Sequence, residues 1–131
     1  MKILTIDDEP SLLDFFRAAL SHKGFQVFTA CNAAEALQIL SVENVALVLL
    51  DVRMPEPNGY LLFEELKKVH TGPVLFVTGD RLAFAENARG PSQLIADGFT
   101  AGSASVLYKP FDLDTLCKKV AECIGLDSLP L

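Results

Sequence analysis

Hydrophobic residues are distributed along the chain in two ways, as short apolar runs and as apolar positions three or four residues apart. The short runs predict strands at residues 2–6, 26–30, 45–50, 73–77 and 105–108. The helical spacing predicts helices at residues 10–23, 33–40, 62–69 and 113–124. Residues 45–50 are apolar throughout, which is typical of a strand covered on both faces. The pattern predicts an α/β fold, a doubly wound five-stranded parallel sheet in three layers (α/β/α).

Residues that favour helix ends lie at the boundaries of the predicted helices. Asn32 is an N-cap residue, and Glu35 follows three positions later, as in a capping box. Asp112 is placed to cap the last helix. Gly24 and Gly125 follow the first and last helices, where glycine accepts the left-handed backbone that ends a helix. Residues 79–102 alone have no clean pattern.

Composition and charge favour a single globular domain and disfavour several classes of binding protein. The 131 residues fit one domain, and 50% hydrophobic residues are typical of a globular chain. The formal charge of −6 disfavours direct binding to nucleic acid or to an anionic membrane. No apolar run reaches the ~18 residues that a membrane span requires. Three cysteines lack metal-ligand spacing and are expected to be buried free thiols in a reducing cytoplasm (Cys31, Cys117 and Cys123).

Other residues are expected in ordinary structural positions. His22 and His70 lie near predicted helix ends and are expected on the surface. The pairs Lys67–Lys68 and Lys118–Lys119 are expected to be solvated helix charges. Most phenylalanines are expected in the hydrophobic core, namely Phe15, Phe16, Phe25, Phe28, Phe63 and Phe76.

Polar residues gather where the predicted strands end. Asp7 and Asp8 follow the first strand, Asp51 the third, Thr78 the fourth and Lys109 the fifth. In an open α/β sheet, binding sites form beyond the carboxyl ends of the strands. Two carboxylates ~4 Å apart repel by about 4 kcal/mol at an effective dielectric of about 20, so a cation is expected between them. Mg²⁺ prefers such oxygen ligands, with phosphate oxygens completing its shell.

The same set of groups suits phosphoryl transfer. An ammonium, a hydroxyl and a divalent cation stabilise the charge on a transferring phosphoryl group. A carboxylate beside them is a nucleophile that forms an acyl phosphate. The residues at the strand ends therefore predict a phosphoryl-transfer site.

Four motifs resemble the receiver domain of two-component response regulators. They are IDDEP at residues 6–10, DVRMP at 51–55 with NG at 58–59, TG at 78–79, and KPF at 109–111. The motifs follow one another in the family's order, and together they extend over almost the whole chain. The resemblance implies a flavodoxin-like (βα)5 fold and the function of a phosphorylation-controlled switch. Such a domain is a phosphoprotein of a phosphorelay. It is not an enzyme, although it assists its own phosphorylation and dephosphorylation.

The resemblance also implies the metal site. Asp51 matches the phosphoacceptor and a metal ligand. Asp8 matches a direct ligand of Mg²⁺, or of another divalent cation such as Mn²⁺, and Asp7 matches a partner that acts largely through water. The backbone carbonyl of Arg53 matches the remaining protein ligand.

Three further residues match the phosphoryl side of the family's site. Thr78 matches the hydroxyl that turns toward the phosphoryl group, and Lys109 matches the ammonium that pairs with it. The peptide bond before Pro110 is expected to be cis. Gly79 fits a need for a small residue beside the phosphoryl path.

Partners follow from the same resemblance. A sensor histidine kinase or a histidine phosphotransfer protein would supply the phosphoryl group. The output would be a downstream effector, which the sequence does not name, contacted through the fourth helix, the fifth strand and the fifth helix. Membrane binding and direct nucleic-acid binding are not expected, and the family pattern allows a homodimer.

The sequence departs from the family pattern in three places. Val106 stands where an aromatic residue is usual, and Tyr108 lies two residues further on, on the same strand face. The segment from Thr78 to Gly102 is longer than usual. Residues 1–126 are expected to be the receiver domain and 127–131 a short tail, with no output domain following. Met1 favours a natural start, and a receiver cut from a longer regulator is an open alternative.

Two other functions use similar residues. A haloacid-dehalogenase-like phosphatase also has a strand-end Asp and Mg²⁺, but it needs a second Asp two residues later, where this chain has Arg53. A pseudo-receiver would be a binding module without phosphorylation, and the complete set of acids, Thr78 and Lys109 disfavours it.

Overall fold

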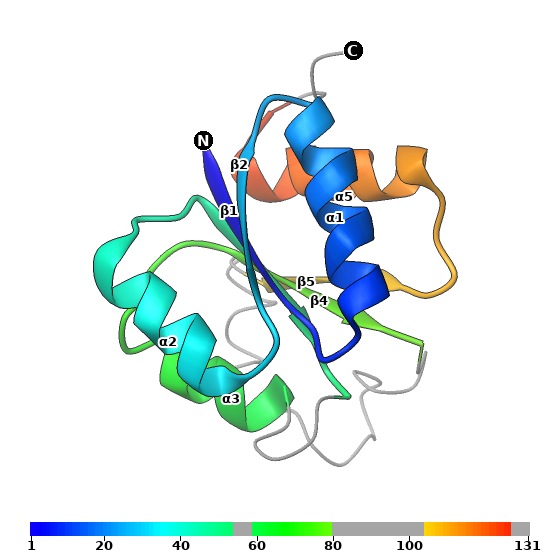
Figure 1. Ribbon diagram of the computed structural model, residues 1–131. Helices are drawn as coiled ribbons and strands as arrows, with labels where there is room; N and C mark the ends of the chain where they lie inside the picture. The colour runs from blue at the N-terminus through cyan, green and yellow to red at the C-terminus, as the bar shows by residue number, and fades with distance from the viewer. Residues whose placement is uncertain (54–58, 80–103, 127–131) are drawn as a thin grey trace.

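The computed structural model describes residues 1–53, 59–79 and 104–126 (Figure 1). Within these ranges strands and helices alternate up to β4, and the order along the chain is β1 (Lys2–Ile6), α1 (Pro10–His22), β2 (Gln26–Ala30), α2 (Ala33–Val42), β3 (Leu47–Asp51), α3 (Gly59–Leu66), β4 (Val74–Thr78), β5 (Ala104–Tyr108) and α5 (Leu113–Ile124). Most of the segment 79–102 and the predicted tail lie outside the described residues, so the predicted boundary at residue 126 stays a prediction. No described helix is both long and apolar enough to cross a bilayer.

The five strands form one parallel sheet in the order β2-β1-β3-β4-β5. Ile6, at the end of β1, pairs with Ala30 on one side and with Leu50 on the other. This is the flavodoxin-like strand order, in which the direction of winding reverses beside β1. The predicted fold class is confirmed.

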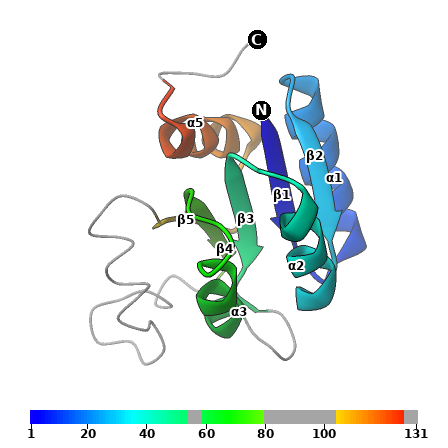
Figure 2. The same cartoon turned by 90° about the vertical axis from the view of Figure 1, so that its left-hand side faces the viewer.

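Helices cover both faces of the sheet. Figures 1 and 2 show α1 and α5 on one face and α2 and α3 on the other. Alternate residues of a strand point to opposite faces. Thus Ile3 packs in the cluster with Phe16 and Leu116, whereas Leu4 packs in the cluster with Phe63. Every residue of β3 and β4 is buried, as expected for central strands of a covered sheet.

The predicted helix ends are largely confirmed. Asn32 caps α2 by accepting a hydrogen bond from Glu35 N (2.9 Å), and Asp112 caps α5 by accepting one from Thr115 N (2.7 Å). Gly125 ends α5 with a φ of 79°. The Glu35 carboxylate accepts from Cys31 N (3.3 Å), one residue before the position that a capping box requires.

Some sequence-based predictions of burial were wrong. The Cys31 side chain is exposed because it follows β2 in the loop, and Cys117 and Cys123 are only half-buried. Phe15 is 40% exposed at the outer edge of α1, whereas His70 is only 4% exposed. Helix α3 ends at Leu66, so Val69 lies beyond it and is exposed.

Candidate functional site

The predicted site residues lie at one edge of the sheet. Asp7 and Asp8 follow β1, Asp51 ends β3, Thr78 ends β4 and Lys109 follows β5. Because β1, β3, β4 and β5 are consecutive neighbours in a parallel sheet, their carboxyl ends bring these residues to the same place. The strand order thus accounts for the convergence of residues more than 100 positions apart in the sequence.

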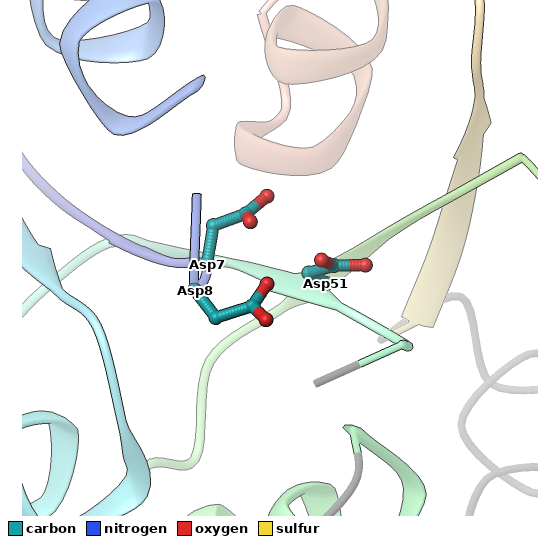
Figure 3. A group of neighbouring side chains, drawn as sticks. All are labelled: Asp7, Asp8 and Asp51. Atoms are coloured by element: carbon teal, nitrogen blue, oxygen red, sulfur yellow. The ribbon is translucent and has the colours of Figure 1, made fainter. Parts of the chain in front are cut away.

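Three carboxylates meet at this edge. Carboxylate oxygens of Asp7, Asp8 and Asp51 lie within 4.8 Å of one another (Figure 3). Asp7 and Asp51 are buried, with 1% and 4% of their surface exposed, whereas Asp8 is exposed. The cluster is therefore anchored inside the protein and is open to solvent at Asp8.

Backbone amides orient the two buried carboxylates. Glu9 N donates to Asp7 Oδ1 (3.0 Å), and Arg53 N donates to Asp51 Oδ1 (3.1 Å). Each bond joins an Asp to the amide two residues later, the local turn that Asp forms readily. Asp7 N also donates to Ala30 O (3.1 Å), which extends the ladder between β1 and β2 by one residue. Both carboxylates are thus oriented by the chain that immediately follows their strands.

The electrostatics of the cluster act most strongly on Asp7. The pKa of its carboxyl is raised from 3.8 to about 7, mainly by burial and also by the neighbouring Asp51, against the opposing effects of the Glu9 amide and of Lys109. A buried acid beside a second acid resists ionisation unless a cation joins them. The site is therefore arranged to gain stability from positive charge.

The donor atoms of the cluster fit a hard divalent cation. They are carboxylate oxygens, which Mg²⁺ prefers. Asp7 Oδ2 is buried and has no hydrogen-bond partner in the structure, so this oxygen can still accept an interaction from water or a cation. The resemblance to receiver domains implies Mg²⁺ at this position, and the residues present fit that ion.

Thr78, Gly79 and Lys109 lie at the same edge of the sheet, where the neighbouring strands β4 and β5 end. Lys109 N donates to Thr78 O (2.8 Å), so the two chain segments run side by side. The peptide bond between Lys109 and Pro110 is cis, as predicted. A Cβ at Gly79 would lie 3.9 Å from Lys109 Cβ, an ordinary contact, so an alanine also fits there.

The remaining predicted residues lie at the rim. Arg53 is exposed, and the metal-binding role of its carbonyl stays a prediction. Residues 54–58 of the DVRMP and NG motifs lie outside the described part of the chain. Val106 and Tyr108 are half-buried and border a groove of about 370 Å³ together with Phe111 and Lys119.

The motifs and the fold agree with one family. The family model described as the response regulator receiver domain matches residues 3–121. The chain belongs to this family. Receiver domains are signalling domains of two-component systems.

Curated relatives are transcriptional regulators. The chain is 35% identical over 132 residues to the transcriptional regulatory protein CrdR of Helicobacter pylori, covering 99% of this chain and 58% of that protein. It is also 35% identical over 129 residues to the CpxR homolog of Haemophilus influenzae, covering 98% of this chain and 52% of that protein. The chain thus spans little more than half the length of these relatives.

Solved structures share the fold. A two-component response regulator from Clostridium difficile matches with a TM-score of 0.77 and 25% identity, covering 95% of this chain and 96% of that one. The response regulator TrrA from Thermotoga maritima, solved in complex with Mg²⁺–BeF, matches with a TM-score of 0.74 and 26% identity, covering 93% and 97%.

Sequence reasoning missed one polar residue near the site. Thr5 is 1% exposed near the end of β1, two residues before Asp7. The available signal was a single hydroxyl within the apolar run of residues 3–6.

Proposed function

We propose that this domain is a phosphorylation-controlled switch in which Asp51 accepts a phosphoryl group at a Mg²⁺ site formed with Asp7 and Asp8. The observation that carries the proposal is the gathering of the three carboxylates within 4.8 Å at the carboxyl edge. Asp51 sits at the end of a central strand, and its Oδ1 is held by Arg53 N. The geometry leaves its other oxygen to act as the nucleophile.

Each residue at this edge has its own part in the proposed phosphoryl transfer. An Asp51 oxygen attacks phosphorus, the bond between phosphorus and the donor breaks, and an acyl phosphate results. Bound Mg²⁺ would supply positive charge to the phosphoryl oxygens, held by Asp8, Asp51, Asp7 through water and the Arg53 carbonyl.

Thr78 and Lys109 respond to the new group. The phosphoryl group adds about −1.5 to −2 charges. The Lys109 ammonium would pair with it, and the Thr78 hydroxyl would turn to donate to it. Thr78 ends β4 and Lys109 follows β5, so their movement would reach the groove at Val106 and Tyr108.

Partners are proposed on the family's pattern. A histidine kinase or a phosphotransfer protein would donate the phosphoryl group in the cytoplasm. An effector would contact the region of β5, α5 and the residues before them. The relatives' names support a role in transcriptional control, exerted through a partner or through a further domain.

Incubation with acetyl phosphate and Mg²⁺ tests the proposal. Intact-mass measurement should find one added phosphoryl group that is labile to hydroxylamine, as an acyl phosphate is. Asp51→Asn should abolish the addition, while Asp14→Asn, an exposed acid on α1, should leave it unchanged. No addition to the wild type would indicate a pseudo-receiver, and continuous release of phosphate without a stable adduct would indicate a phosphatase.

A further inference from the structure

Two buried side-chain oxygens near the carboxylate cluster lack hydrogen-bond partners. Among the described residues, the buried polar side-chain atoms without a partner are Thr5 Oγ1 and Asp7 Oδ2. Both residues are 1% exposed. Buried polar groups in proteins are nearly always paired, with protein atoms or with ordered water. Two such atoms in neighbouring positions call for a common explanation.

The two oxygens lie on the same face of the sheet. Asp7 continues the β1–β2 ladder through its bond to Ala30 O, so Thr5 and Asp7 point to the same side, that of Ile3 and the helices α1 and α5. Their Cα atoms are about 6.6 Å apart along the strand. Two hydrogen bonds of about 2.8 Å that meet at the tetrahedral angle of one water span about 4.5 Å between oxygens, which suits side chains at this spacing.

Among the described residues, no side chain on that face pairs directly with the Thr5 hydroxyl. Its neighbours in register are Thr29 on β2 and Leu49 on β3. The Thr29 hydroxyl accepts a hydrogen bond from Arg17 Nη2 (2.7 Å), and Leu49 belongs to the apolar cluster. The polar group that lies next along the face is the Asp7 carboxylate.

We infer that one buried water joins Thr5 Oγ1 to Asp7 Oδ2 and that Thr5 is a positioning residue for the carboxylate cluster. The Thr5 hydroxyl donates to the water, and the water donates to Asp7 Oδ2. Glu9 N already holds Asp7 Oδ1 (3.0 Å), so the water would fix the second oxygen and with it the plane of the carboxylate. Groups behind metal ligands orient them and tune metal affinity in this way.

The inference rests on the proposed function where it concerns Mg²⁺, but the water itself does not depend on that function. Three variants separate the two. Thr5→Val removes the hydroxyl and keeps the shape, and Thr5→Ser keeps the hydroxyl. Thr29→Val makes the same chemical change at the neighbouring position in register, where the hydroxyl is bonded to Arg17.

The first measurement is Mg²⁺ affinity by calorimetry at pH 8. Thr5→Val should weaken binding about tenfold, the lower end of the effect of an outer-shell partner. Thr5→Ser should restore it, and Thr29→Val should bind as the wild type does. Affinity unchanged in Thr5→Val would overturn the positioning role, even if that variant is less stable.

The second and third measurements need no metal. Thermal unfolding in EDTA should show Thr5→Val less stable than the wild type, because the Asp7 oxygen loses its paired water. A more stable Thr5→Val would mean that the hydroxyl is simply unpaired, and would overturn the inference. NMR should detect a long-lived water through cross-peaks to the Thr5 protons. Their absence in the wild type overturns the inference, whereas a wild type that shows the water and fails to bind Mg²⁺ overturns only the proposed function.

Discussion

At the carboxyl edge of the sheet three carboxylates lie together, whereas at the amino edge Lys2, Lys67 and His70 each have a partner of opposite charge or an accepting oxygen. Lys2 Nζ lies 2.7 Å from Glu43 Oε2. Lys67 Nζ donates to Gly72 O (2.8 Å), and His70 Nε2 lies 3.1 Å from Pro73 O. The same sheet therefore has satisfied interactions where its strands begin and an acidic cluster where they end.

The two edges differ in what they contribute, because one adds stability and the other holds the groups that bind a cation. Carboxylates that repel one another destabilise the metal-free state, and that repulsion is relieved when a cation binds. Paired groups at the opposite edge stabilise the fold without taking part in the site. Changes at the amino edge should therefore lower stability and leave Mg²⁺ binding intact, while removal of a charged carboxylate from the cluster should raise stability without metal and weaken Mg²⁺ binding.

His70→Ala should have the largest effect on stability. The imidazole is 4% exposed, and its Cε1 lies 2.9 Å from the position of a Cβ on Gly72, so the turn is built closely around it. Losing this packing and the bond to Pro73 O should cost about 2–3 kcal/mol in the free energy of unfolding. Urea denaturation measures this loss.

The matched control is His22→Ala, because His22 is exposed at the end of α1. Its effect should stay within about 0.5 kcal/mol. Burial lowers the pKa of His70, so its contribution is fully present above its unfolded pKa of 6.5 and is lost as the pH falls through the lowered value. A loss as small as that of the control would show that the amino edge does not depend on this imidazole.

Asp7→Asn should have the next largest effect, in the opposite direction. Because the folded pKa of Asp7 is raised from 3.8 to about 7, its contribution to stability is fully present below pH 3.8 and is lost as the pH rises through about 7. The amide removes this charge while its oxygen can still accept from Glu9 N. We expect a gain of about 1–3 kcal/mol at pH 8 without metal, together with weaker Mg²⁺ binding.

Urea denaturation in EDTA between pH 5 and pH 8 checks this prediction. The wild type should lose stability across the range relative to Asp7→Asn, and the difference between the two should shrink toward the acidic end. Asp14→Asn, on the exposed side of α1, should follow the wild type. Parallel curves for wild type and Asp7→Asn would mean that the acidic cluster does not strain the fold.

The sequence predicted the fold and the members of the cluster for clear physical reasons. Uninterrupted apolar runs mark buried parallel strands, and parallel strands bring their carboxyl ends to one edge. The positions of Asp7, Asp8 and Asp51 directly after such runs therefore predict that they lie together, as they do. The roles of Arg53, Thr78 and Lys109 in chemistry stay predictions, because they depend on a bound phosphoryl group.

The sequence did not predict which polar and aromatic residues would be buried. His70 follows α3 in a turn and is buried because Gly72 leaves room for its ring, which a three- or four-residue periodicity does not reveal. Phe15 is exposed because Phe16, the next residue on α1, takes the inward position. Burial at such positions depends on the angle at which a helix meets its neighbours, and a single sequence carries little of that information.

The smallest predicted effect concerns the ion pair between Lys2 and Glu43. Its side chains are 41% and 29% exposed, so solvent screens the attraction, and exposed pairs contribute at most about 1 kcal/mol. A double-mutant cycle with Lys2→Met and Glu43→Gln should give a coupling of about 0.5 kcal/mol that weakens in 1 M salt.

The pair Lys68–Glu65 is the comparison, at 3.1 Å with 68% and 54% exposure, and its coupling should be smaller. The Lys2 pair also joins the start of β1 to the end of α2, 41 residues away, whereas the other lies within one turn of chain. A coupling of zero for the Lys2 pair would mean that the amino edge owes its stability to buried contacts such as that of His70, with no measurable share from this ion pair.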